Sequence, residues 1–265
     1  MTIRDRKRLE TRSPLIAAHT LITQRYQSYA QAIASGALAG LQQDTQALLL
    51  SAPLRECYTG STKALEALKK DIKDVQPVRL LKYCPMCGTT LPKTFDHYMP
   101  AVMFPELAVH PLNLVPCCST CNSTKGDNWL SSSGDRQYLH AYTDELPDLQ
   151  FVTVSLHQIP ALRGVGATYS LQQPIGVLNA QWQLIESHFN RLKLIARYDE
   201  LGNDEIAEIL SDCRAHIDAG GPDAREFLAG RATDRRMIYG RNHWIAVLMK
   251  AMAHHQDFDD WVNAA

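Results

Sequence analysis

In this 265-residue chain, the residues whose spacing most clearly indicates a chemistry are two Cys-x-x-Cys pairs, Cys84/Cys87 and Cys118/Cys121. A tetrahedral zinc ion takes four soft ligands, and two such pairs supply them as two chelating knuckles. Cys117 competes with Cys118 for the third position, but only Cys118 has the correct spacing to Cys121. We therefore predict a structural zinc ion on the four paired cysteines, against the alternative of four unrelated buried thiols.

The residues between and beside the knuckles suit the hydrolysis of a phosphodiester. Thirty residues separate Cys87 from Cys118, and this segment contains Asp96 and His97. Asn122 directly follows the second pair of cysteines. A histidine with a near-neutral pKa can accept a proton from water. Carboxylate and amide oxygens can hold a hard divalent cation, which neutralises charge on the phosphate and on the departing oxygen.

The order of these residues resembles that of the HNH endonucleases, in the His-Asn-Asn version found in CRISPR effector nucleases. The resemblance covers about residues 80–130 and rests on Asp96-His97, Pro100, Asn113-Leu114 and the segment from Cys118 to Asp127. His97 lies sixteen residues before Asn113, which lies nine before Asn122. The resemblance implies a ββα-metal module, in which a β-hairpin and a helix grip one catalytic metal ion.

The resemblance also implies a role for each residue. His97 would be the general base, and Asp96 and Asn122 would hold a catalytic Mg²⁺ or Mn²⁺. Asn113 would orient the loop or the His97 ring, and Lys125 would contact a phosphate of the nucleic acid. Ordinary alternatives stay open: a turn cap for Asp96, local hydrogen bonds for the two asparagines, and a solvated side chain for Lys125.

Helical spacing supports part of this arrangement. Cys118, Cys121, Asn122 and Lys125 are spaced as i, i+3, i+4 and i+7, which places them on one helix face. One short helix, with Gly126 near its end, would then present zinc ligands, a metal ligand and a phosphate contact together.

One difficulty concerns the adjacent residues Asp96 and His97. In a regular strand they would point to opposite faces. Both reach one centre only if the strand ends or twists there, and Pro100 agrees with a nearby strand end.

The rest of the chain has mainly helical patterns, so we predict an α+β fold in which the zinc-stapled module is embedded between helical regions. The expected regions are 1–78 (helical), 79–135 (HNH module) and 136–265 (short strands, then helices). Helices are expected at about 14–34, 41–50, 62–75, 179–198, 203–220 and 242–252, and strands at 149–155 and 167–171.

Composition limits the partners. The formal net charge of −1 means that any affinity for nucleic acid must come from local basic patches. The candidates are residues 4–12, then Lys69, Lys70 and Lys73 with Arg79 and Lys82, then Arg231 with Arg235, Arg236 and Arg241. Seven cysteines, an odd number, together with the lack of a secretory signal or membrane-length apolar run, predict a cytoplasmic protein.

The function that we expect is an HNH endonuclease acting on nucleic acid, with DNA favoured over RNA. By analogy with other HNH proteins it would serve in anti-phage defence, with a partner such as an ATPase or a second copy of the chain. Two alternatives stay open. One is a zinc-stabilised binding module without catalysis, and the other is an interaction subunit whose partner performs the cleavage.

Overall fold

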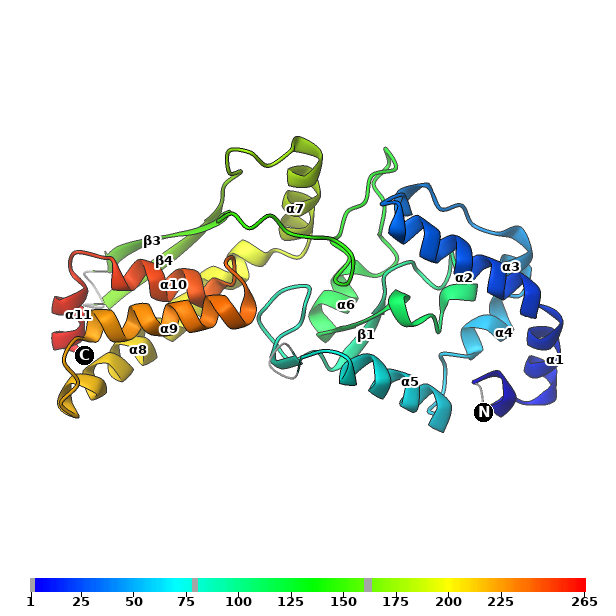
Figure 1. The fold of residues 1–265 in the computed structure, drawn as a ribbon, viewed down its shortest axis with the longest axis horizontal. Coiled ribbons are helices and arrows are strands. Elements are labelled where there is room, and N and C mark those ends of the chain that lie inside the picture. The colour runs from blue at the N-terminus through cyan, green and yellow to red at the C-terminus, as the bar shows by residue number, and fades with distance from the viewer. Residues whose placement is uncertain (1–2, 78–80, 160–163) are drawn as a thin grey trace. The chain divides into compact units, whose positions relative to one another are not determined.

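The computed structural model describes residues 3–77, 81–159 and 164–265. The chain divides into two compact units, Met1–Glu145 and Leu146–Ala265, and the described residues of each contain a two-stranded antiparallel sheet among helices (Figure 1). The mixed helical and β composition agrees with the prediction at this coarse level. No helix in the described part of the chain combines the length and apolar character that crossing a bilayer requires.

The first unit begins with helices. They are α1 (Leu9–Ala17), α2 (His19–Ala34), α3 (Thr45–Leu49), α4 (Ser51–Glu56) and α5 (Lys63–Asp74). Helix α1 begins earlier than expected and contains Pro14, whose ring removes one backbone hydrogen bond of the helix. Helix α5 agrees with its prediction: the Thr62 side chain accepts a hydrogen bond from the Leu65 N–H and caps the helix.

A β-hairpin and a helix follow, in the order that a ββα unit requires. Strand β1 (Thr94–His97) pairs antiparallel with β2 (Leu114–Cys117), with His97 opposite Leu114, and α6 (Ser119–Lys125) comes next. The loop between the strands contains two 3₁₀ turns, η4 (Pro105–Leu107) and η5 (Pro111–Asn113). A small apolar cluster of Ile72, Phe95 and Leu114 packs α5 against the hairpin, so burial of these side chains fixes α5 beside β1.

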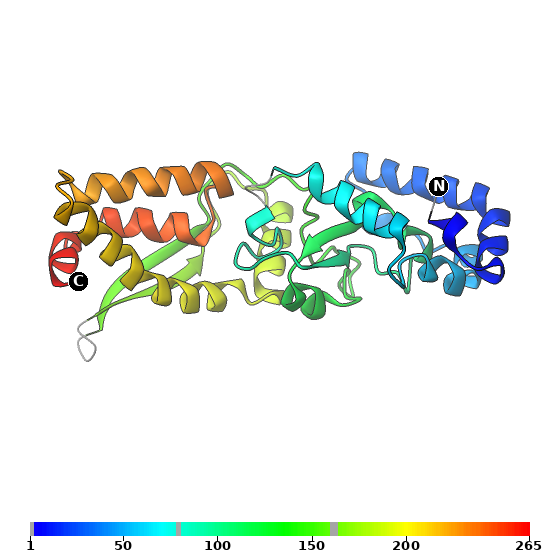
Figure 2. The same ribbon diagram turned by 90° about the horizontal axis from the view of Figure 1, so that it is seen from below.

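The second unit packs helices against a longer hairpin (Figure 2). Strands β3 (Val152–Ile159) and β4 (Gly164–Leu171) pair antiparallel, both longer than predicted. The helices are α7 (Asn179–Arg191), α8 (Leu194–Asp218), α9 (Ala224–Tyr239), α10 (Trp244–Ala253) and α11 (Phe258–Ala264). Helix α10 is almost wholly buried, which agrees with its apolar sequence.

The predicted helix boundary near Asn203 is wrong. The chain breaks instead at Lys193, which has φ 52°, and α8 continues through Asn203. The Asn203 amide accepts a hydrogen bond from the Ala167 N–H at 2.9 Å and donates one to the Ala167 carbonyl at 3.0 Å. This long-range pairing with β4 uses the side-chain groups that would otherwise cap a helix.

Candidate functional site

The four paired cysteines lie together in the first unit. Their sulfur atoms are all within 4.8 Å of one another, and all four residues are buried. The Cys87 and Cys118 sulfurs are 3.9 Å apart, close to the ~3.8 Å edge of a tetrahedron with Zn–S bonds of ~2.3 Å. The cluster therefore has the donor set and the spacing to hold a metal ion such as zinc.

Local backbone geometry presents these sulfurs. In the first knuckle the Cys87 and Gly88 N–H groups donate to the Cys84 carbonyl, and Gly88 has φ 67°, a conformation that glycine adopts without strain. In the second, the Cys118 sulfur caps α6 by accepting from the Cys121 N–H. Side-chain hydrogen bonds from Cys84 and Cys87 raise the pKa of the Cys121 thiol, whereas a bound cation would favour thiolates.

Cys117 does not belong to the cluster. Its sulfur lies 3.3 Å from the Thr94 hydroxyl, across the hairpin, and burial raises its pKa to about 11. The spacing argument that chose Cys118 over Cys117 is confirmed by this grouping.

His97 stands at the end of β1, half-buried. Its Nε2 lies 2.9 Å from the Ala108 carbonyl oxygen. A carbonyl can only accept, so Nε2 must carry the proton and Nδ1 is the basic nitrogen of the neutral ring. Burial lowers the pKa of His97, although the Ala108 carbonyl opposes this. The ring packs edge-on against Tyr58, with centroids 4.4 Å apart.

Asp96 is buried in an ion pair with Lys125. The Lys125 Nζ lies 3.1 Å from Oδ1 and 3.0 Å from Oδ2 of Asp96, and it also donates to the His97 carbonyl at 2.8 Å. The Lys125 side chain has 0% exposure. The expectation of a solvated lysine or a phosphate contact at Lys125 is therefore wrong: α6 turns this residue inward, under β1. Burial raises the pKa of Asp96, although Lys125 opposes this.

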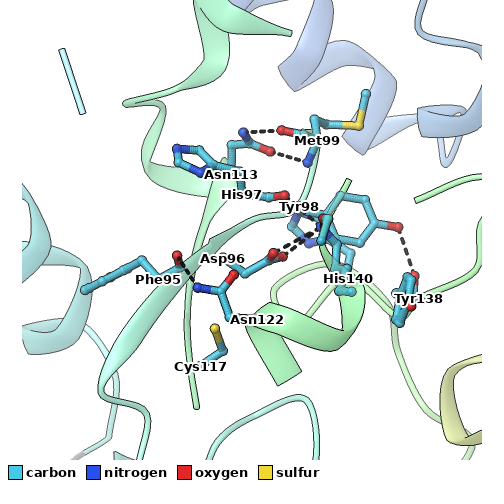
Figure 3. Close-up of polar contacts among 12 residues, drawn as sticks. Phe95, Asp96, His97, Tyr98, Met99, Asn113, Cys117, Asn122, Tyr138 and His140 are labelled. Atoms are coloured by element: carbon cyan, nitrogen blue, oxygen red, sulfur yellow. Dashed lines mark hydrogen bonds and ion pairs between the residues drawn. The ribbon is translucent and has the colours of Figure 1, made fainter. Parts of the chain in front are cut away.

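Asn122 projects from α6 toward β1. Its Nδ2 lies 3.4 Å from the Phe95 carbonyl oxygen and 3.4 Å from the Thr94 hydroxyl. Because a carbonyl only accepts, the amino group must face Phe95, and the amide oxygen is turned toward Asp96 (Figure 3).

Asn113 holds the loop between the strands. Its Oδ1 accepts from the Met99 N–H at 2.7 Å, and its Nδ2 donates to the carbonyls of Met99 at 3.0 Å and Leu107 at 3.1 Å (Figure 3). The side chain is fully buried. These contacts fit the role of orienting the loop. Among the described residues, Asn113 forms no hydrogen bond to the His97 ring.

Asp96, His97 and Asn122 line one cavity of about 280 Å³. The strand ends at His97, so the two adjacent residues of β1 reach the same space. Arg55 of α4 and the exposed Asp127 line it too, and neither was predicted as a site residue. Asp127 follows the helix end directly, but Arg55 comes from a distant helix whose approach to the hairpin depends on tertiary packing.

Comparison with known proteins adds one similarity. The chain is 36% identical over 135 residues to the protein ea31 of Escherichia phage lambda. The matched part covers 51% of this chain and 45% of ea31, so the chain spans less than half the length of that relative. No family model matches, and no solved structure matches.

Proposed function

We propose that the first unit is a metal-dependent HNH-type endonuclease that hydrolyses phosphodiester bonds, with DNA as the favoured substrate. The observation that supports this most strongly is the shared cavity of Asp96, His97 and Asn122. A base, a carboxylate and an amide oxygen meet there, beside a hairpin and helix in ββα order. Its place in a defence system, with a partner such as an ATPase, stays a prediction.

His97 is the proposed general base. The Ala108 carbonyl keeps the proton on Nε2, so Nδ1 can take a proton from the attacking water. Burial lowers the pKa of His97, which keeps the ring neutral and ready to accept at neutral pH. The edge-on contact with Tyr58 restricts the ring's rotation, so the base has a fixed orientation.

Asp96 and Asn122 fit a hard divalent cation such as Mg²⁺ or Mn²⁺. The Asn122 amino group is engaged with β1, which leaves its oxygen for a ligand role, and the exposed Asp127 lines the same cavity. A bound cation there would supply charge neutralisation at the phosphate. Because Lys125 already contacts both oxygens of Asp96, Asp96 would be shared between the ammonium and the metal ion.

The cysteine cluster has a supporting role in this proposal. Cys121 directly precedes Asn122 in α6, and Cys118 caps that helix. A zinc ion bound to the cluster would therefore fix the start of α6, and with it the position of the Asn122 side chain.

A second candidate is a zinc-stabilised module that binds nucleic acid or protein without catalysis. The Asp96–Lys125 ion pair favours this alternative, because a lysine that neutralises the carboxylate can serve a purely structural purpose. The two candidates differ in metal content: the nuclease should bind a weak, exchangeable Mg²⁺ or Mn²⁺ in addition to zinc.

Plasmid cleavage tests the proposal. Supercoiled plasmid, single-stranded DNA and RNA would be incubated with the protein in Mg²⁺, in Mn²⁺ or in neither, using wild type and His97→Ala. We expect metal-dependent cleavage that His97→Ala abolishes, with zinc content unchanged. His157→Ala, which removes an exposed histidine of β3, is the matched control and should cleave like wild type. Full activity of His97→Ala would exclude His97 as the base.

A further inference from the structure

A second, larger cavity adjoins the first. Its volume is about 750 Å³, and it shares Tyr58, His97 and Asn122 with the smaller one. Its lining contains four lysines and only two carboxylates, namely Lys69, Lys70, Lys73 and Lys93 against Glu66 and Asp74. The net charge of −1 for the whole chain therefore conceals a cationic surface directly beside the candidate base.

The fold gives Lys69 and Lys73 defined positions. They are one turn apart on α5, whose apolar face packs against the hairpin through Ile72. The Nζ atoms of Lys69 and Lys73 lie 5.9 Å and 5.4 Å from the centre of the Phe95 ring, and Lys69 is 5.0 Å from that of Tyr58. Cation–π contacts therefore keep both ammonium groups over Phe95 of β1, in a cavity that His97 also lines.

The carboxylates compensate only part of this charge. Asp74 forms its ion pair with Lys70, and Glu66 lies 3.6 Å from Lys69. Among the described residues (3–77, 81–159 and 164–265), neither Lys73 nor the exposed Lys93 takes part in an ion pair. The smaller cavity, which His97 also lines, contains Arg55 in its lining. Both cavities that contain the candidate base therefore also contain cationic side chains.

We infer that these two cavities form one track for the phosphodiester backbone of duplex DNA, from Arg55 across His97 to Lys69, Lys73 and Lys93. The inference rests on the proposed function and names the substrate-binding surface of the same site. A single small anion would need cations that converge on one point, whereas these come from α4, α5 and the residue before β1. Lysine contacts to phosphates position a nucleic acid without reading its sequence, so binding is sequence-independent and salt-dependent.

Fluorescence polarisation with a labelled 30-base-pair duplex tests the track separately from cleavage. The full chain with His97→Ala would be titrated in Mg²⁺ from 50 to 200 mM KCl, alone and combined with Lys69→Gln, Lys73→Gln and Lys93→Gln. Loss of three phosphate contacts should reduce the slope of log K against log salt by about 2.7. Affinity near 0.1 M salt should fall about tenfold or more. Lys63→Gln, an exposed lysine of α5 outside the cavity, is the matched control and should leave slope and affinity unchanged.

The outcomes separate the track from the nuclease. If wild type cleaves plasmid but the triple variant binds like Lys63→Gln, the track is wrong and the proposed function stands. Absence of duplex binding by the His97→Ala protein also overturns the track, and absence of cleavage by wild type then counts against the nuclease as well. Labelled single-stranded DNA and RNA form parallel arms. A loss confined to either of these would overturn duplex DNA as the ligand.

Discussion

Replacing Lys125 by methionine should destabilise the first unit strongly. Methionine keeps most of the volume of the side chain and removes its charge, which leaves the Asp96 carboxylate buried without its cation. The two side chains are 0% and 4% exposed, so solvent screens the pair very little. Breaking a buried pair of this kind by removing one partner costs about 3–5 kcal/mol.

The double variant Asp96→Asn with Lys125→Met isolates the charge effect. Because it removes both charges, it should recover most of the loss, as replacing both members of a buried pair is often nearly neutral. Asp96→Asn alone should resemble Lys125→Met, since it leaves the ammonium unpaired. The three variants form a double-mutant cycle whose coupling energy reports the pair.

Hydrogen exchange measured on peptides is the suitable assay. A melt of the whole chain mixes two compact units, whereas peptides from β1 and α6 report the unit that contains the pair. The exchange free energy in these peptides should fall by about 3–5 kcal/mol in Lys125→Met and remain unchanged in α10. A loss below about 1 kcal/mol, the range of surface pairs, would refute the reasoning and indicate a solvent-facing Lys125.

Three further predictions concern the same unit. Cys121→Ser should release zinc and unfold the module, whereas Cys117→Ser should retain zinc, and elemental analysis of the purified variants would decide; equal zinc in both would contradict the four-cysteine site. Asn113→Ala removes three hydrogen bonds of 2.7–3.1 Å from a buried position and should lower the free energy of unfolding by at least ~2 kcal/mol. Urea denaturation, monitored on peptides from the loop between β1 and β2, would measure this loss. No change in the free energy would mean that the loop does not depend on these hydrogen bonds. Burial lowers the pKa of His140 to about 4, so between pH ~6.5 and 4 the unfolded chain binds the proton more tightly. The free energy of unfolding should therefore fall by up to ~3 kcal/mol as the pH drops through this window. In acid denaturation, His140→Gln should lose less stability than wild type.

The sequence was most informative where the chemistry depends on local spacing. Two knuckles and a helix are short segments whose geometry follows from a few consecutive residues, so the grouping of Cys84, Cys87, Cys118 and Cys121 could be predicted. Helix α5 could be predicted equally well, from its capping residue and its apolar stripe. These patterns predict which side chains of the segment face inward, although the partner that buries them comes from elsewhere in the chain.

Prediction failed where a residue's role depends on a partner far away in the chain. Helical spacing placed Lys125 on the face with Asn122, but only the packing of α6 under β1 shows that its ammonium meets Asp96 rather than solvent. Arg55 joins the cavity because α4 packs near the hairpin, and Asn203 stays helical because it pairs with Ala167. No local pattern contains this information.

The separation of the two knuckles has a consequence during protein synthesis. Cys84 and Cys87 leave the ribosome well before Cys118 and Cys121, and at about 5–20 residues per second the interval is roughly 2–6 seconds. During that time a nascent chain can offer a metal only half of its thiolates. Asn122 is made directly after the last cysteine, so the candidate active centre is completed only when the tetrad is. Under the proposed function, a newly made chain would therefore become able to cleave only after the second knuckle is synthesised.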